Sequence, residues 1–315
     1  MDIDVLGTLA VREEGVSITP TAPKPRQVLA LLALHADQVV PVGVLAEELW
    51  GAKPPRSARP TLQTYILQLR ELITAALAGD GGGPARSAKD VLLTVPGGYL
   101  LRSGEGVSDV REFDRLAGAG YRAMDAGDPP RAARLLREAL ALWTGPALSD
   151  VHTGPHLATQ ARRLEESRLC ALDQRIEADL RLGRHRELLA EMTVLVSRYP
   201  THESLYGQYM LALYRSGRRG EALDAYQRLR ATLVRTLGLE PSAALSKLQR
   251  SILRSGPDPV PARHTPAGPD PVPARHTPAG HATTAPATVG PATVGPATVG
   301  PAPVGPATVG PAAVG

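Results

Sequence analysis

Proline recurs at every fifth position from Pro286 to the end of the chain, and this spacing limits how much of the protein can fold. Six pentapeptides follow one another there, four of them PATVG, and PDPVPARHTPAG at 257–268 is repeated unchanged at 269–280. Proline at this density excludes helices and interior strands, and the small side chains cannot form a core. We therefore predict that residues 256–315 are a disordered Pro/Ala/Gly tail, either without function or acting as a spacer or tether.

The part of the chain before this tail is long enough for two domains with cores of their own. Of the 315 residues 43% are hydrophobic, and Cys170 is the single cysteine, which excludes an internal disulfide and a cysteine metal cluster. No apolar run reaches the length of a bilayer span, and the N-terminal MDIDVLGTLAV lacks the basic start of a secretory signal. We expect a cytoplasmic, nucleoid-associated protein that has no membrane partner.

The first hundred or so residues alternate between strand and helix patterns. IDVLGTLAVR predicts a strand pair with a turn at Gly7, and Pro96-Gly97-Gly98 predicts a hairpin. Apolar periodicity predicts helices at 25–36, 44–50 and 61–77, the last with Ser57 as N-cap. Strands, helices and a final hairpin in this order are typical of an α+β winged helix-turn-helix domain, which we place at residues 1–104.

Residues 108–255 are predicted to be helical throughout, with a glycine at each of several turns between Ala/Leu-rich helices. Gly183 and Gly217 are 34 residues apart, which is the period of a tetratricopeptide (TPR) repeat, and Gly127 precedes a similar helix. A glycine that ends one helix in a left-handed conformation allows the next helix to pack antiparallel to it. We predict an all-α, TPR-like domain with a concave binding surface; the alternative is an ordinary helical bundle.

The helix predicted at 61–77 has two contrasting faces. Leu62, Ile66, Leu69 and Ile73 form one apolar stripe, whereas Gln63, Thr64, Leu67 and Gln68 lie on the other side. Glutamine and threonine side chains can hydrogen-bond to base edges, and leucine can contact a thymine methyl group. Between Leu49 and Arg70 there are four basic residues and no acidic one, although residues 1–107 as a whole carry 10 basic and 11 acidic residues. This local positive cluster favours phosphate binding.

Motifs for catalysis or metal binding are lacking. GDGGGPARSAK does not have the spacing of a phosphate-binding loop, and neither G-x-S-x-G nor a dinucleotide-binding fingerprint occurs. His152 and His156 are separated by Gly154-Pro155 and cannot share a helix face, and we interpret Cys170 as a buried thiol. We therefore predict no catalytic residue, no metal site and no cofactor.

Several strings of the sequence identify a family resemblance over residues 1–254. PRQVLALLALHADQVVPVGVLAEELW, GAKPPRSARPTLQTYILQLRELI and VPGGYLL resemble the DNA-binding domain of the Streptomyces antibiotic regulatory protein family. WTGPAL and ALYRSGRRGEALDAYQRLRATLVRTLGLEPSAAL resemble the bacterial transcriptional activation domain of that family. The resemblance implies an OmpR/PhoB-type winged helix at 1–104 and an activation domain at 108–255.

The resemblance also implies which residues contact DNA. The third helix becomes the recognition helix, with base contacts expected from Gln63, Thr64, Leu67 and Gln68. Phosphate contacts are expected from Lys24, Arg26, Lys53, Arg56, Arg59, Thr61, Tyr65 and Arg70, and the wing hairpin from Gly97, Gly98 and Tyr99. The recognition helix contains less arginine than is usual for OmpR-type domains, so we expect modest affinity per domain and a dependence on two adjacent copies.

The implied function is activation of transcription, without enzymatic activity. Family membership implies binding to direct repeats of double-stranded promoter DNA near a secondary-metabolite (antibiotic) gene cluster, a second copy of the chain on that DNA, and recruitment of RNA polymerase holoenzyme. Two alternatives use the helical domain differently. The protein could be a protein-interaction adaptor, or a regulator that senses a small ligand in its concave groove.

Overall fold

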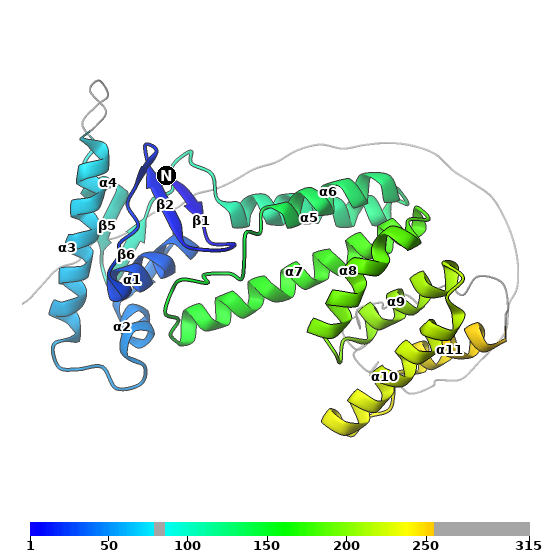
Figure 1. Cartoon of the computed structure of the whole chain (residues 1–315). Coiled ribbons are helices and arrows are strands. Elements are labelled where there is room, and N and C mark those ends of the chain that lie inside the picture. The colour runs from blue at the N-terminus through cyan, green and yellow to red at the C-terminus, as the bar shows by residue number, and fades with distance from the viewer. Residues whose placement is uncertain (79–85, 255–315) are drawn as a thin grey trace, which may run out of the picture. The chain divides into compact units, whose positions relative to one another are not determined.

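The computed structural model describes residues 1–78 and 86–254, all of which belong to one compact unit. The predicted tail at 256–315 lies outside the described residues, and so does most of the glycine-rich segment at 79–89. An N-terminal domain of strands and helices is followed by a purely helical domain (Figure 1).

The N-terminal domain begins with a three-stranded antiparallel sheet. Strand β1 (Asp2–Asp4) pairs with β2 (Ala10–Glu13), and β2 pairs with β3 (Val16–Ser17). Ile3 lies opposite Val11, and both side chains are buried, as the alternation of the sequence predicts. The predicted strand pair is confirmed.

Helices and a second sheet complete the winged helix. In chain order they are α1 (Pro23–Leu34), β4 (Val39–Pro41), α2 (Val42–Trp50), α3 (Ala58–Leu77), α4 (Ala88–Val91), β5 (Leu92–Val95) and β6 (Gly98–Leu101). The second sheet has the order β4-β6-β5, and all of its pairs are antiparallel. The sequence analysis did not predict β4 or α4, because both are too short to show a period.

The hairpin β5–β6 is the predicted wing, and two glycines shape it. Gly97 has a φ of +83°, a left-handed conformation that follows directly from the Pro96-Gly97 turn. At Gly98, a Cβ atom would lie 2.4 Å from the carbonyl oxygen of Val40 on β4, so a side chain there would push the strands apart. The next residue, Tyr99, pairs with Val40 and Thr94 and is buried. Tyr99 is therefore a core residue of the wing and not an exposed one.

The second domain is helical as predicted. It consists of α5 (Asp109–Asp125), α6 (Pro129–Ala141), α7 (Pro155–Arg181), α8 (His185–Arg198), α9 (Glu203–Arg215), α10 (Arg219–Leu237) and α11 (Ala243–Leu253). Successive helices pack as hairpins, α5 on α6, α8 on α9 and α9 on α10. The first core of the chain includes Ala171 of α7, and a second core includes Ile176 of the same helix, so α7 passes from one core into the other.

The predicted glycine turns repeat one hydrogen-bond pattern. Gly127, Gly183 and Gly217 have φ values of +75°, +79° and +81°. After each glycine, the next N–H donates back to a carbonyl one turn earlier, for example from Arg184 to Asp179 and from Arg218 to Leu213, at 3.1 and 2.9 Å. This is the Schellman geometry that ends a helix at a left-handed residue. The glycine turns that the sequence predicts are therefore present at all three positions.

Cys170 departs from the prediction. The residue is exposed on α7 and not buried, because its neighbour Ala171, 100° further around the helix, is the one that faces the core. Partial burial of the thiol, reinforced by Asp173 and Glu166, raises the pKa of Cys170. Within the described part of the chain, no helix is long and apolar enough to cross a membrane, and no cluster of His, Cys, Asp or Glu could hold a metal ion.

Candidate nucleic-acid interface

Helix α3 is amphipathic in the way that its sequence predicts. Leu62, Ile66, Leu69 and Ile73 are at most 2% exposed and belong to the core of the N-terminal domain. Gln63, Thr64, Leu67 and Gln68 all lie on the exposed face, and Leu67 is 57% exposed despite being apolar. The helix therefore presents two amides, a hydroxyl and an isolated apolar side chain to the outside, which is a set of groups suited to base edges.

Of the four side chains on this exposed face, Thr64 is the one that forms a hydrogen bond to another described residue. Thr64 Oγ1 donates to the carbonyl of Pro60, 3.2 Å away, and its remaining lone pair and methyl group stay accessible. Gln63 and Gln68 have no hydrogen-bond partner among the described residues. Their amides are therefore available as donors and acceptors to a ligand in front of the helix.

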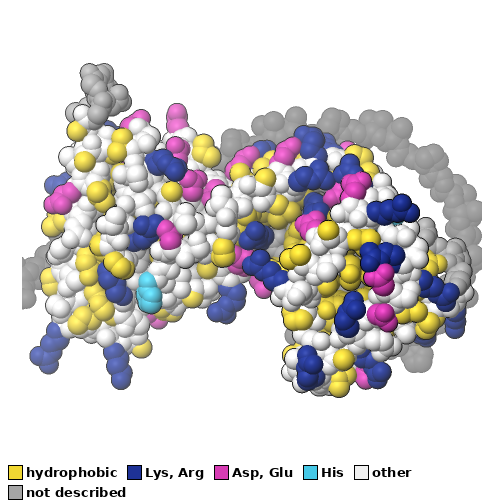
Figure 2. Space-filling model, in the orientation of Figure 1, with side chains coloured by type: hydrophobic (Ala, Val, Ile, Leu, Met, Phe, Trp, Pro, Cys, Tyr) yellow, Lys and Arg dark blue, Asp and Glu magenta, His cyan; other side chains and the backbone are white. Residues whose placement is uncertain are grey.

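A cationic loop lies at the start of α3. Lys53, Arg56 and Arg59 are exposed, and none of them has a hydrogen-bond or ion-pair partner within the described ranges 1–78 and 86–254. Figure 2 shows Lys or Arg side chains projecting from the lower end of the N-terminal domain, where Figure 1 places the connection between α2 and α3. We call Lys53, Arg56 and Arg59 the cationic loop; it has the exposure and charge that phosphate contacts need.

Arg70 has a role that the sequence analysis missed. Its Nε and Nη2 atoms donate to the carbonyl of Leu92 at 3.1 and 2.8 Å, and Nη2 also donates to the hydroxyl of Thr94 at 2.8 Å. Arg70 thus connects helix α3 to strand β5 of the wing. The guanidinium group is committed to this contact and is not free in the way the cationic loop is.

Lys24 and Arg26 are also engaged elsewhere. Lys24 Nζ donates to the carbonyl of Leu49 at 2.6 Å, at the end of α2. Arg26 donates to the carbonyls of Pro20 and Leu9 and forms an ion pair with Asp150 of the helical domain. Both side chains therefore support the fold, and their contacts to phosphate stay a prediction.

Thr61 and Tyr65 lie between the buried stripe and the exposed face of α3. Both are partly buried, and the Tyr65 ring packs against the core of the N-terminal domain. They lie on the same helix as the exposed amides, and we retain them as proposed edge contacts to the DNA backbone.

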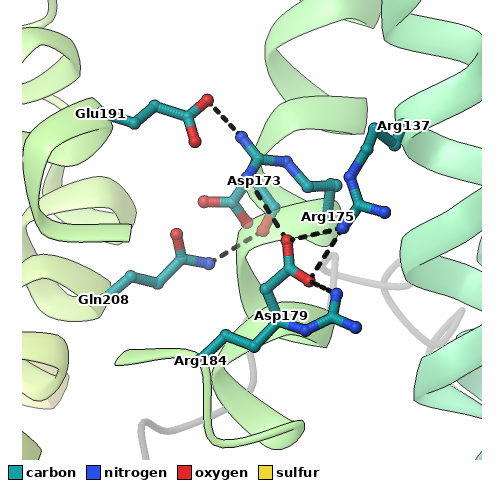
Figure 3. A network of polar contacts seen from close by, with 7 residues as sticks. All are labelled: Arg137, Asp173, Arg175, Asp179, Arg184, Glu191 and Gln208. Carbon is teal, nitrogen blue, oxygen red and sulfur yellow. Dashed lines mark hydrogen bonds and ion pairs between the residues drawn. The ribbon is translucent and has the colours of Figure 1, made fainter. Parts of the chain in front are cut away.

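The helical domain contains a buried polar network at the place where α6, α7 and α8 meet. Asp179 on α7 is 3% exposed, and its carboxylate accepts hydrogen bonds from Arg184, Arg137 and Arg175 at 2.8, 3.1 and 3.4 Å (Figure 3). Arg175 also pairs with Glu191 on α8. The network joins three helices and leaves Arg184, which directly precedes α8, paired within the chain.

Together, the fold and the exposed face of α3 define a class: a winged-helix transcriptional regulator that carries a helical activation domain. Residues 16–81 match the family model "Transcriptional regulatory protein, C terminal", and residues 108–253 match "Bacterial transcriptional activator domain". The chain is 53% identical over 257 residues to the regulatory protein DnrI of Streptomyces peucetius, with 82% of this chain and 93% of DnrI covered.

Two further relatives extend the comparison. The regulatory protein AfsR of Streptomyces coelicolor is 38% identical over 254 residues, which are 80% of this chain and 24% of AfsR. The solved structure of Mycobacterium tuberculosis EmbR, in complex with a low affinity phosphopeptide, has a TM-score of 0.73 at 33% identity and covers 81% of this chain and 65% of EmbR. The chain belongs to the Streptomyces antibiotic regulatory protein family of transcriptional activators, as its sequence motifs predict.

Proposed function

We propose that this activator binds double-stranded promoter DNA with α3 in the major groove and the cationic loop on the phosphate backbone. Two copies bind adjacent direct repeats near a secondary-metabolite gene cluster in the nucleoid, and the helical domain contacts RNA polymerase. The match of residues 108–253 to an activator domain supports the last of these contacts.

The observation that carries the proposal is that unpaired cationic side chains at the start of α3 adjoin unpaired amides on its exposed face. Lys53, Arg56 and Arg59 have no partner among the described residues, and they adjoin a face with unpaired Gln63 and Gln68. Phosphate contacts orient a protein on DNA, and contacts to base edges supply the sequence preference. Groups suited to both kinds of contact lie within a few turns of one another, which supports the proposal.

The salt dependence of binding tests this proposal. A duplex that the wild-type chain selects from a random-sequence library serves as the probe in gel-shift titrations at several salt concentrations. Each phosphate contact adds about 0.9 to the steepness of the plot of log K against log salt. Removal of the three cationic-loop charges in K53A/R56A/R59A should therefore make this plot less steep by about 2.7.

A matched control removes three other exposed arginines. R131A/R228A/R235A takes the same charge from the helical domain, where none of the three side chains has a hydrogen-bond or ion-pair partner in the described structure. We expect the control to keep nearly the wild-type slope. Equal slopes for the two triple variants would contradict the placement of DNA on the cationic loop.

Direct repeats are tested separately. Because α3 carries few arginines, one domain should bind weakly and two linked sites should bind much more tightly. Gel-shift titrations on a single selected site and on a tandem of that site compare the two cases. A single site that binds as tightly as the tandem would rule out dependence on a second copy.

A further inference from the structure

Glu48 on α2 is a buried carboxylate whose partners come mainly from the other domain. It is 2% exposed, and one oxygen accepts hydrogen bonds from Gln27 Nε2 at 2.9 Å and from the backbone N–H of Gly154 at 2.5 Å. The second oxygen accepts from the N–H groups of His156 and Leu157 at 2.9 and 3.0 Å. A side chain of the winged helix therefore caps the N-terminus of α7 in the helical domain.

The start of α7 lacks a cap of its own. Its N-cap is Gly154, which has no side chain, and the first helical residue, Pro155, has no N–H. The N–H groups that remain unsatisfied at the start of a helix attract negative charge, and Glu48 supplies it. A Cβ atom on Gly154 would lie 2.1 Å from the carbonyl oxygen of Glu48, so the two backbones are in direct contact and leave no space for a side chain.

Carboxylates of the helical domain also accept hydrogen bonds from backbone N–H groups of the winged helix. Asp109, the first residue of α5, accepts from the N–H groups of Val5 and Leu6 at 2.6 and 2.7 Å. Asp150 accepts from the N–H of Leu9 at 2.8 Å. The segment between β1 and β2 thus obtains backbone partners from the helical domain, while the helical domain obtains the cap of α7 from the winged helix.

The apolar side chains at the junction belong to one core. Leu6 and Leu45 of the N-terminal domain and Phe113, Leu148 and Leu157 of the helical domain are at most 2% exposed, and all lie in the same cluster of buried residues. A buried core that continues from one domain into the next resists relative motion, because any shift would expose apolar surface and unpair buried N–H groups.

We propose that Glu48 is a positioning residue that fixes the helical domain relative to the recognition helix. Helix α2 directly precedes α3, so the contact of Glu48 with α7 ties the activation domain to the helix that reads DNA. The place of α3 on the promoter then determines where the helical domain is presented to RNA polymerase. This inference rests on the proposed function, since it assigns a purpose to the junction only if α3 binds DNA.

The chain supplies matched variants for a test. E48Q keeps the shape of the side chain but removes its charge and turns an NH₂ group towards N–H donors. E47Q removes the same charge from the neighbouring residue, whose carboxylate is 55% exposed and, among the described residues, pairs with the ring Nε2 of His156 alone. G154A disturbs the same junction from the helical side while leaving Glu48 unchanged.

The first measurement is amide hydrogen exchange on the free full-length protein, which needs no DNA. E48Q and G154A should speed exchange at the start of α7, including His156 and Leu157, by about tenfold or more, and E47Q should match the wild type. Equal exchange in E48Q and E47Q would overturn the role of Glu48 as a cap. If E48Q does not fold, G154A against E47Q decides the same question.

The second measurement reports orientation on DNA. Cys170, the single cysteine and an exposed one, carries a donor dye, and the end of the selected duplex carries the acceptor. The wild type and E47Q should give one narrow energy-transfer distribution, and E48Q a broader one at a similar DNA affinity. A distribution as narrow in E48Q as in the wild type would overturn the proposal. Failure of every variant, wild type included, to bind any selected duplex would instead contradict the proposed function, and the exchange data would still decide the cap.

Discussion

Arg70, in the middle of helix α3, donates a hydrogen bond of 2.8 Å to the hydroxyl of Thr94 in the first strand of the wing. The same guanidinium holds the carbonyl of Leu92 with two further hydrogen bonds. This link fixes the wing at one distance from α3. In the proposed complex, a wing held in this way approaches the DNA backbone beside the groove that α3 would enter, in the arrangement that winged helices use.

The link between Arg70 and Thr94 can be separated from a phosphate contact by a neutral substitution. T94V removes one acceptor of Arg70 without changing any charge, and it should weaken DNA binding by about threefold, the effect of a modest hydrogen bond. The salt slope should stay unchanged, because no cation is lost. Gel-shift titrations of T94V, R70Q and the double variant check this. Independent, additive losses would indicate that Arg70 acts on DNA and not through the wing.

Base contacts and phosphate contacts should respond differently to alanine. Q68A removes an amide from the exposed face of α3 and should relax the preference at one base position, worth about 1–3 kcal/mol of discrimination. R59A should weaken binding to all sequences alike and lower the salt slope by about 1. Selection from a random library followed by titration measures both. A uniform loss on every sequence for Q68A would transfer Gln68 to the group of backbone contacts.

The elements of the DNA-binding domain could be predicted from the sequence because their signals are local. The apolar stripe of α3, the Pro96-Gly97 turn and the glycine turns of the helical domain depend on residues within a few positions of one another. The exposed positions of Gln63, Thr64, Leu67 and Gln68 follow from the same period.

The roles of individual charged residues could not be predicted in this way, because their partners are distant in the chain. Arg26 pairs with Asp150, 124 positions away, and Glu48 caps a helix whose N-cap, Gly154, lies 106 positions later. Sequence patterns identify a basic residue near a DNA-binding helix but do not show whether an acidic partner elsewhere already occupies it. One local signal was nevertheless present: Gly154-Pro155 begins a helix without a capping side chain, and such a helix needs a cap from another part of the fold.

Low pH should weaken the contact between Asp37 of the N-terminal domain and Arg111 of the helical domain. Burial raises the pKa of Asp37, but hydrogen bonds from Ser103 and Arg111 outweigh this effect and hold the pKa at about 2, below its usual value of 3.8. The stability that the folded state gains from ionised Asp37 is therefore complete above pH 3.8 and is lost as the pH falls towards about 2. Asp37 has a φ of +67°, which asparagine tolerates, so D37N removes the charge without new backbone strain.

Urea denaturation of D37N and the wild type at several pH values measures this contribution. The difference in their free energies of unfolding should be constant between pH 5 and 7 and should shrink between pH 4 and 2. Because the Asp37 carboxylate is 44% exposed, the difference should be small. A difference that grows as the pH falls would show that the contact is not held by the ionised carboxylate.

The network around Asp179 should be the most sensitive polar site of the helical domain. Arg175 is 7% exposed, and its guanidinium shares Asp179 with Arg137 and Arg184. D179N removes an acidic partner from Arg175, which is buried, and from Arg137 and Arg184, which are half exposed. Because Asp179 and Arg175 form a buried ion pair, the substitution should cost about 3 kcal/mol. D224N is a suitable control, since Asp224 is exposed on α10 and has no partner among the described residues. Urea denaturation should show a large loss of unfolding free energy for D179N and almost none for D224N.

Because the network lies where α7 passes from the first core to the second, D179N should also make hydrogen exchange faster in α8 than in α3. A D179N protein as stable as D224N would mean that packing alone holds α6, α7 and α8 together.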